Sequence, residues 1–254
     1  VTAANKAQAA GYRAQLKGRE GFLVVPDPGD KRVGSLGATV NVHDGTYQLA
    51  STLKIERPVT VRSANGRDKT TLKPASAGGI RLVYINHAAA TLDGFTLTGG
   101  KTLDRLTGNP HGGGVYIDTA GGTVDNCLIE KCAVGYELTH GLAVKLSAPN
   151  AVVRRTIIRQ NEGGTGTTGS WGSVYMTDGG VVDNCLIYGN KMAFGAGVYI
   201  EQNGSRGVIL NSTIMDNTGG SGNDLYVYKS GSAITNSIIG ALTYDGDENI
   251  SAKL

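Results

Sequence analysis

Residues 185–200 read Cys-Leu-Ile-Tyr-Gly-Asn-Lys-Met-Ala-Phe-Gly-Ala-Gly-Val-Tyr-Ile, and pieces of this stretch recur before and after it along the chain. A strand-like piece at 185–187 leads to Asn190 at a corner and then to a Gly-rich turn at 195–197. A second strand-like piece at 198–200 follows the turn. This order of strand, corner, turn and strand predicts one side of a repeating coil.

The repeat is clearest when it is aligned on the second residue of the turn dipeptide within Val-Asp-Asn-Cys-Leu-Ile, residues 182–187. Six positions then align: Gly94, Asn126, Arg155, Asn184, Asn211 and Asn236. Their successive spacings are 32, 29, 29, 27 and 25 residues. A spacing of this size is typical of one coil of a solenoid.

A bend must interrupt the strand at each aligned position. An apolar residue stands two positions before it and another stands three positions after it, as Val182 and Ile187 do around Asn184. Side chains of a strand alternate with period two, so an odd separation of five cannot keep both residues inside one regular strand. Asn and Gly tolerate the left-handed conformation that a tight bend requires. Arg155 is the exception and predicts local strain or a different bend.

The corner after the bend predicts a second stacked column. Asn161, Asn190 and Asn217 occupy it in later coils, and Cys132 occupies it in an earlier one. Asn side chains in such a column can hydrogen-bond from coil to coil and to free backbone groups.

Three short parallel strands per coil predict an all-β, right-handed parallel β-helix of about eight coils, roughly 40 Å long at about 4.8 Å per coil. We assign residues 39–240 to this domain, with early strands at 39–42, 53–55 and 59–61. Residues 1–38 are expected to form an N-terminal cap or assembly arm, with a short helical or irregular segment within residues 1–20. Residues 241–254 are expected to form a C-terminal cap or tail.

Composition narrows the function classes. The chain has 254 residues, 39 of them Gly, and its 24 Lys and Arg against 21 Asp and Glu give a net charge of +3. This charge is too small to predict a nucleic-acid partner. No run reaches the ~20 apolar residues of a membrane helix, and the first residues lack the apolar core of a signal peptide. Cys127, Cys132 and Cys185 show no CxxC or disulfide pattern and are expected to be small buried hydrophobes.

The strand that follows the Gly-rich turn predicts an outward column of tyrosines. Aliphatic residues alternate there with Tyr84, Tyr116, Tyr175, Tyr199 and Tyr226, and Ala143 is read as a gap in the column. Outward aromatic rings could bind sugar rings or a partner protein, which makes these tyrosines candidate ligand-binding residues. The structural alternative is a self-stacking ladder that stiffens the sheet.

A polar column follows the tyrosines on the same expected face and provides the only catalytic candidates. It is read as Asn86, Asp118, Lys145, Thr177, Glu201 and Tyr228. Lys145 could act as the base of a polysaccharide lyase, with Asp118 one coil away, and Glu201 is a further ligand-binding candidate. The alternative is a solvated charged face. The four histidines have no paired spacing, so no metal site or cofactor is expected.

Two long loops, at 99–113 and 161–172, precede the tyrosine strand, and the second carries Trp171. Loops beside a rigid scaffold commonly hold binding residues, so Trp171 joins the candidate ligand-binding set.

The two repeated pieces resemble the repeats of chlamydial polymorphic outer-membrane proteins and related bacterial surface β-helix proteins, which have a pectate-lyase-like fold. The resemblance rests on 185–199 and on its variants at 112–116, 158–161 and 214–217. Ile stands where that family has Phe, and Cys132 replaces the corner Asn once. The resemblance implies an extracellular or cell-surface setting and, often, adhesion.

These observations favour a non-catalytic extracellular or cell-surface protein with a structural, adhesive or self-assembling role. The alternatives are a polysaccharide-active enzyme of the lyase type and a glycan-binding module that uses the tyrosine face. The expected partners are a polysaccharide, a host or cell-surface protein, or further copies of the chain joined end to end. No nucleic-acid partner and no membrane span within this chain are expected.

Overall fold

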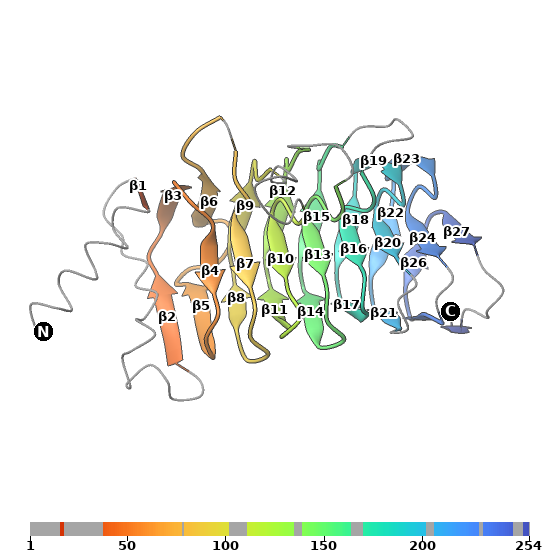
Figure 1. The fold of residues 1–254 in the computed structure, drawn as a ribbon, viewed down its shortest axis with the longest axis horizontal. Coiled ribbons are helices and arrows are strands. Elements are labelled where there is room, and N and C mark those ends of the chain that lie inside the picture. Colours follow the sequence, from red (N-terminus) through yellow and green to blue (C-terminus); the bar gives the residue numbers. More distant parts are fainter. Residues whose placement is uncertain are drawn as a thin grey trace, which may run out of the picture.

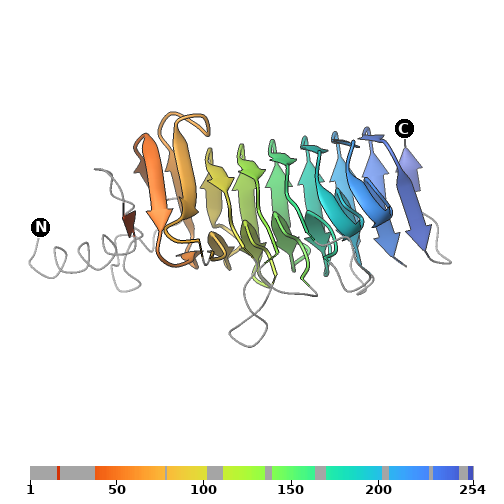
Figure 2. The ribbon, with the colours of Figure 1, turned by 90° about the horizontal axis from the view of Figure 1, so that it is seen from above.

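The computed structural model describes residues 16–17, 38–77, 79–101, 111–134, 139–163, 170–201, 206–228, 231–245 and 251–253. They form a rod of stacked coils with β2 near one end and β27 near the other (Figure 1). Viewed from above, the strands of each coil lie beside those of the preceding coil along the rod (Figure 2). The predicted all-β parallel β-helix is confirmed.

Successive strands fall into three long sheets. Sheet A has the order β1 (Leu16–Lys17), β3 (Gly45–Leu49), β6 (Thr70–Pro74), β9 (Thr96–Thr98), β12 (Leu128–Glu130), β15 (Ile157–Arg159), β18 (Leu186–Tyr188), β22 (Thr213–Met215) and β26 (Ile238–Ile239). Sheet B has the order β2 (Ala38–Val42), β5 (Val59–Ser63), β8 (Thr91–Asp93), β11 (Gly122–Asp125), β14 (Ala151–Arg154), β17 (Gly180–Asp183), β21 (Gly207–Leu210), β25 (Ala233–Thr235) and β28 (Ser251–Lys253). Sheet C runs from β4 (Leu53–Ile55) through β7 (Val83–Ile85), β10 (Val115–Ile117), β13 (Val144–Leu146), β16 (Val174–Met176), β20 (Val198–Ile200) and β24 (Leu225–Tyr228) to β27 (Leu242–Asp245). A short fourth sheet pairs β19 (Lys191–Phe194) with β23 (Thr218–Ser221).

The regular repeat makes about six turns, slightly fewer than the eight or so coils expected. The three predicted early strands are present as β2, β4 and β5, and they continue the sheets of the later coils, with β2 and β5 in sheet B and β4 in sheet C. All sheet partners in the described ranges are parallel except β1, which pairs antiparallel with β3.

The structure differs from the prediction at both ends of the domain. At Leu16–Lys17 the structure has strand β1 where a helical or irregular segment was expected within 1–20, and the rest of 1–20 lies outside the described residues. At the other end β27 and β28 pair in parallel with β24 and β25, so coils continue beyond residue 240 where a cap or tail was expected. The described residues include no helix long and apolar enough to cross a membrane.

The core lies between the three sheets and consists mainly of aliphatic side chains. In β10, for example, Val115 and Ile117 are both fully buried, and their partners in β7 and β13 are Val83, Ile85, Val144 and Leu146. Burying a side chain of this kind contributes about 1.5–3 kcal/mol. The register between coils therefore places each aliphatic side chain next to an aliphatic side chain of the neighbouring coil.

The bends predicted from the repeat are confirmed. All six aligned residues have positive φ angles: Gly94 at 79°, Asn126 at 50°, Arg155 at 52°, Asn184 at 50°, Asn211 at 49° and Asn236 at 48°. Arg155 makes the same bend as its neighbours rather than a different one. A left-handed conformation costs a non-Gly residue roughly 1–2 kcal/mol, and Arg lacks the short polar side chain that reduces this cost for Asn. The strain predicted at this position is present.

The corner at the asparagine column also has a left-handed residue, which comes one position before the Asn or its equivalent and was not predicted. The residues concerned are Gly99, Lys131, Gln160, Gly189 and Asp216, with φ angles between 54° and 72°. In the Gly-rich turn the left-handed residue is Gly195, with φ of 50°. Gly197 serves a different need, because a Cβ there would lie 2.3 Å from Asp224 O of the next coil.

The asparagine column forms the predicted ladder. Asn161 Nδ2 donates to Asn190 Oδ1 at 2.8 Å, and Asn190 Nδ2 donates to Asn217 Oδ1 at 2.8 Å. Asn217 Nδ2 donates to Asp224 Oδ1 at 2.9 Å, which ends the ladder. The same amides donate to carbonyls of sheet A, and each Oδ1 accepts a backbone N–H of the preceding coil, as at Cys132 N to Asn161 Oδ1. All members are buried, so each amide satisfies groups that would otherwise be unpaired.

Replacement of Asn190 by Ala should destabilise the rod by about 3–5 kcal/mol, because it leaves the amide of Asn161 and two buried carbonyls without their partner, at about 1–3 kcal/mol for each unsatisfied group. Urea unfolding measures the change. The matched control is Asn184→Gly in the same coil, where the exposed bend accepts Gly and stability should change by less than about 0.5 kcal/mol. Equal effects of the two substitutions would contradict the role assigned to the ladder.

Candidate functional site

The outer surface of sheet C carries one continuous row of side chains. The register pairs Lys54 with Tyr84, and the row continues through Tyr116, Lys145, Tyr175, Tyr199 and Tyr226. The tyrosines thus lie on the side of the sheet away from the aliphatic core, as expected.

Lys145 is a member of this tyrosine row, and its assignment to the polar column is wrong. It pairs with Tyr116 and Tyr175, so Ala143 is not the gap in the row, and Ser147 rather than Lys145 follows the strand as Asp118 does. The expected register differs from the structure by two residues. A shift of two preserves the alternation between inward and outward side chains, so the apolar run Leu142, Ala143, Val144 fits both registers.

The tyrosines are less accessible than an outward column suggests. Tyr116 is 5% exposed, Tyr175 2% and Tyr199 8%, whereas Tyr84 and Tyr226 are half-buried. Tyr175 and Tyr199 stack with ring centroids 5.2 Å apart, and Tyr199 and Tyr226 stack at 5.0 Å. The ring faces therefore contact one another, and the expectation of open faces for sugar rings is wrong for the three buried tyrosines.

Histidine rings continue the stack where Lys145 interrupts the row of tyrosines. His140 stacks on Tyr175 with centroids 4.4 Å apart, and His111 stacks on His140 at 4.5 Å. The aromatic column consequently runs from His111 to Tyr226. At the end of the row nearer β4, Tyr84 meets Tyr116 edge to face at 5.7 Å.

Lys145 lies inside this aromatic layer. Its Nζ is 5.6 Å from the ring centre of Tyr116 and 5.7 Å from that of Tyr175, distances at which cation–π attraction operates. Its side chain is buried, and no hydrogen bond links its Nζ to the described part of the chain. Burial lowers the pKa of Lys145 to about 8, although the carboxylates of Glu201, Asp178 and Asp118 oppose the shift.

The tyrosine hydroxyls donate to carboxylates of the row beside them. Tyr84 donates to Asp118 Oδ2 at 2.6 Å and Tyr116 to Asp118 Oδ1 at 2.9 Å. Tyr175 donates to Glu201, and Tyr226 donates to Asp245 Oδ2 at 3.1 Å.

The pKa values of this face follow from burial and from these hydrogen bonds. Burial and the carboxylate partner raise the pKa of Tyr84 and of Tyr175. Burial would raise the pKa of Asp118, but the hydrogen bonds from Tyr84, Thr119 N and Tyr116 lower it overall. Burial and the charge of Lys145 lower the pKa of His111 to about 3 and of His140 to about 4, so both imidazoles are neutral at pH 7.

A second row of aromatic side chains lies at the corner before sheet C, and sequence reasoning missed it. His111, His140, Trp171 and Phe194 each precede a glycine with a positive φ angle. Trp171, half-buried, contacts His140 at 4.7 Å and Phe194 at 5.7 Å between ring centroids. The repeated aromatic–Gly dipeptide was the available signal. The loops expected beside Trp171 lie partly outside the described residues, at 102–110 and 164–169.

The catalytic candidates do not form a convergent set. Asp118 is held by two tyrosine hydroxyls and Thr119 N, and Glu201 by Tyr175. Two buried hydroxyl oxygens, of Thr139 and Thr177, find no hydrogen-bond partner among the residues that the structure describes. In the described residues no group of three His, Cys, Asp or Glu side chains is arranged to hold a metal ion.

Comparison with known proteins identifies the family of this architecture. The family model described as "Right handed beta helix region" matches residues 79–249, more than half of the chain. The chain belongs to the right-handed β-helix family. No curated protein and no solved structure gives a significant match to it. The family match spans the whole column from His111 to Tyr226, so the aromatic layer is part of the right-handed β-helix coil itself.

Replacement of Lys145 by Met should stabilise the protein at pH 7 by about 1–3 kcal/mol, because each unit of lowered pKa corresponds to about 1.4 kcal/mol that the buried ammonium costs. Between about pH 8, the pKa in the folded chain, and pH 10.5, the ordinary pKa of a lysine, the unfolded chain binds more protons than the folded chain. The stability of the wild type therefore rises with pH across this window relative to the variant, and the advantage of the variant should shrink to below about 1 kcal/mol at pH 10.

Urea unfolding of both proteins at pH 7 and pH 10 measures this difference. Lys54→Met is the matched control, because Lys54 is exposed at the start of the same row. This control should change stability by less than about 0.5 kcal/mol at either pH. An advantage of Lys145→Met that does not change with pH would contradict the desolvation of this ammonium.

Proposed function

We propose that this chain is a non-catalytic β-helix of the cell surface or extracellular space, with a structural, adhesive or self-assembling role. The observation that carries the proposal is that the outward polar side chains of sheet C contact neighbouring side chains of the rod. Both oxygens of Asp118 accept tyrosine hydroxyls, Glu201 accepts Tyr175, and Lys145 lies between two rings. A general acid or base must reach a substrate, and these groups face their own neighbours.

Stiffness along the rod is the property that this arrangement supports. The aromatic column and the asparagine ladder both cross several coils in the axial direction. Polar networks that are fully satisfied in a buried setting make a structure rigid. A rigid rod suits a spacer, a load-bearing element or an adhesive stalk.

Two features support an extracellular setting. The repeat pieces resemble those of chlamydial-type surface proteins, as described above. In addition, burial raises the pKa of Cys127, Cys132 and Cys185 to about 12, so these thiols stay protonated and resist oxidation.

End-to-end assembly is supported by the end of the rod formed by β26, β27 and β28. These are the last strands of sheets A, C and B, and their outer edges have no partner strand in the part of the chain that is described. Ile238 is 64% exposed and Leu242 is 47% exposed at this end. Unpaired edges next to apolar side chains favour pairing with another chain.

A second candidate function, a polysaccharide lyase, is favoured by Lys145 alone. With a pKa of about 8, a substantial share of its amine is neutral in mildly alkaline solution. A neutral amine could take the proton from the carbon next to a uronate carboxylate, after which the glycosidic oxygen leaves and a carbon–carbon double bond forms. The burial of Lys145 opposes this candidate.

Incubation of the wild type with uronate polymers, namely polygalacturonate, alginate and hyaluronan, should release no unsaturated ends, as followed by ultraviolet absorbance at pH 8–9. The physical reason is the enclosure of Lys145. Release of such ends by the wild type and by Lys54→Ala, but not by Lys145→Ala, would overturn the non-catalytic proposal in favour of a lyase.

Replacement of Ile238 by Glu should weaken self-association of the wild type at least tenfold, because a charge at the unpaired edge must be desolvated on pairing. Sedimentation velocity over a concentration series measures the effect. Leu186→Glu is the matched control, since Leu186 lies in the same column two coils inside the rod and is 38% exposed. A wild type that stays monomeric at every concentration, or equal effects of both substitutions, would remove the self-assembling role.

A further inference from the structure

The corner between sheets B and A holds an arginine that the fold does not need. Arg155 takes the left-handed bend position where four coils have Asn and one has Gly. Either residue would suit this backbone better than Arg. An outlier of this kind raises the question of what its side chain does.

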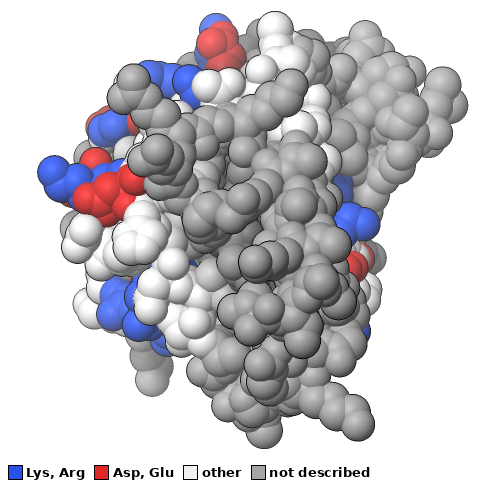
Figure 3. Space-filling model, turned by 90° about the vertical axis from the view of Figure 1, so that its left-hand side faces the viewer, with Lys and Arg blue, Asp and Glu red and all other residues white. Residues whose placement is uncertain are grey.

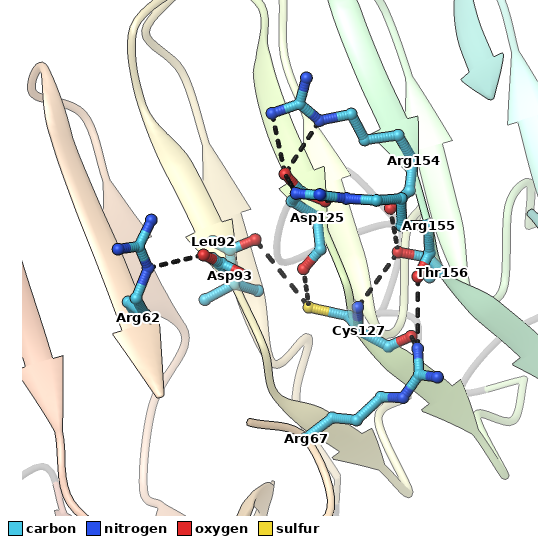
Figure 4. A network of polar contacts seen from close by, with 9 residues as sticks. All are labelled: Arg62, Arg67, Leu92, Asp93, Asp125, Cys127, Arg154, Arg155 and Thr156. Carbon is cyan, nitrogen blue, oxygen red and sulfur yellow. Dashed lines mark hydrogen bonds and ion pairs between the residues drawn. The ribbon is translucent and has the colours of Figure 1, made fainter. Parts of the chain in front are cut away.

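Arg155 and its neighbour Arg154 converge on one carboxylate, that of Asp125 in the preceding coil. Arg155 Nε donates to Asp125 Oδ1 at 2.8 Å and its Nη2 to Oδ2 at 2.6 Å. Arg154 Nε donates to Oδ2 at 2.9 Å, and its Nη2 lies 2.8 Å from the same oxygen. Figure 4 shows both guanidinium groups directed at Asp125. The Asp125 side chain is only 3% exposed, so it lies beneath the two arginines.

This arrangement leaves positive charge and hydrogen-bond donors at the surface. One carboxylate faces two guanidinium groups, and the register places Asp93 beside Asp125 and Asp183 beside Arg154. Each guanidinium has five N–H donors, and both use only their Nε and Nη2 atoms on Asp125. The side chains of Arg154 and Arg155 are 48% and 57% exposed.

A third arginine lies at the same corner. Arg67 Nη1 donates to Cys127 O and to Arg155 O, both at 3.2 Å, and Figure 4 shows its guanidinium below the bend. Carbonyl partners do not neutralise its charge, so the four arginines and three aspartates of this stretch, with Arg62, Asp93 and Asp183 counted, leave one surplus positive charge. Viewed from the β2 end of the rod, described Lys and Arg side chains lie beside Asp and Glu side chains (Figure 3).

A purely structural role does not account for both arginines. Arg154 alone gives Asp125 an ion pair and needs no strained backbone, because it lies in β14. The paired hydrogen bonds of Arg155 stabilise the buried Asp125 carboxylate, and the left-handed bend offsets part of that gain. What the second arginine adds is a fixed guanidinium, already oriented by its bonds to Asp125.

We propose that Arg154 and Arg155, with Arg67 beside them, bind the oxyanion groups of an acidic polysaccharide that lies along this corner of the rod. Guanidinium groups bind carboxylates and sulfates through paired N–H donors. The side chains are held in place before binding, which reduces the entropic cost of association. The inference deepens the adhesive form of the proposed function and rests on it.

The test uses the full chain and binding to immobilised polygalacturonate, dextran sulfate, neutral dextran and single-stranded DNA at low salt. The wild type should bind an acidic polysaccharide and not dextran, with affinity falling as salt is added. The double variant Arg154→Thr/Arg155→Asn should bind at least tenfold more weakly. Arg155→Asn alone should bind about threefold to tenfold more weakly while its thermal midpoint changes by less than about 4 °C, because Asn suits the bend.

The matched control is Arg62→Thr. Arg62 is 52% exposed, lies three strands from Arg154 in the same sheet B row and pairs with Asp93 at 2.7 Å, so its loss removes an equal charge without touching Asp125. Binding should change less than twofold. Tighter binding to dextran sulfate identifies sulfate as the group recognised, and tighter binding to polygalacturonate identifies carboxylate.

Several results would overturn the inference: no binding of either acidic polysaccharide, stronger binding of DNA, equal weakening by Arg62→Thr, or a destabilised Arg155→Asn that binds as the wild type does. None of these results bears on whether the rod releases unsaturated ends, so failure here is distinct from failure of the non-catalytic proposal.

Discussion

The parallel register between neighbouring coils is the constraint on which the rest of the structure depends. Every outward or inward side chain lies directly over its equivalent in the next coil, at a strand spacing of about 4.8 Å. Aliphatic residues, aromatic rings and amides gain from this arrangement, because each can contact a copy of itself. The core, the aromatic column and the asparagine ladder are three results of the same register.

Charged residues are the exception, because stacking like on like is unfavourable for them. The sheet B row places Asp93 directly beside Asp125. Each carboxylate has an arginine on its other side, with Arg62 on Asp93 and Arg154 on Asp125. Lys145 meets the same constraint differently, since its neighbours in the row are tyrosine rings rather than lysines. Such breaks in the column are where a repeat protein departs from its own pattern, and they are the natural places to look for function.

Sequence reasoning succeeded where a side chain's role depends on local backbone geometry. The bend at Asn184 and its equivalents followed from the odd spacing of apolar residues and from the tolerance of Asn for positive φ. It failed at Lys145, because a register shift of two residues leaves the inward and outward alternation intact. It also could not show that Tyr116, Tyr175 and Tyr199 are buried, since their cover comes from other rows and corners: His140 stacks on Tyr175, Arg81 lies over Tyr116, and Tyr199 lies between two tyrosine rings. Outward side chains are buried when other residues lie over them in space, and the periodicity of the sequence does not show which residues do so.

The asparagine ladder has a direction. Each amide donates toward the next coil, from Asn161 to Asn190 to Asn217, and the series ends on Asp224, whose carboxylate has no N–H to pass on. Asp224 accepts from both the side chain and the backbone of Asn217 and so closes the series. Duplication or deletion of a whole coil within the ladder preserves every donor and acceptor. A further Asn placed after Asp224 would find no N–H there to accept, so this residue marks the end of the ladder, although the backbone continues into the coil of β26, β27 and β28.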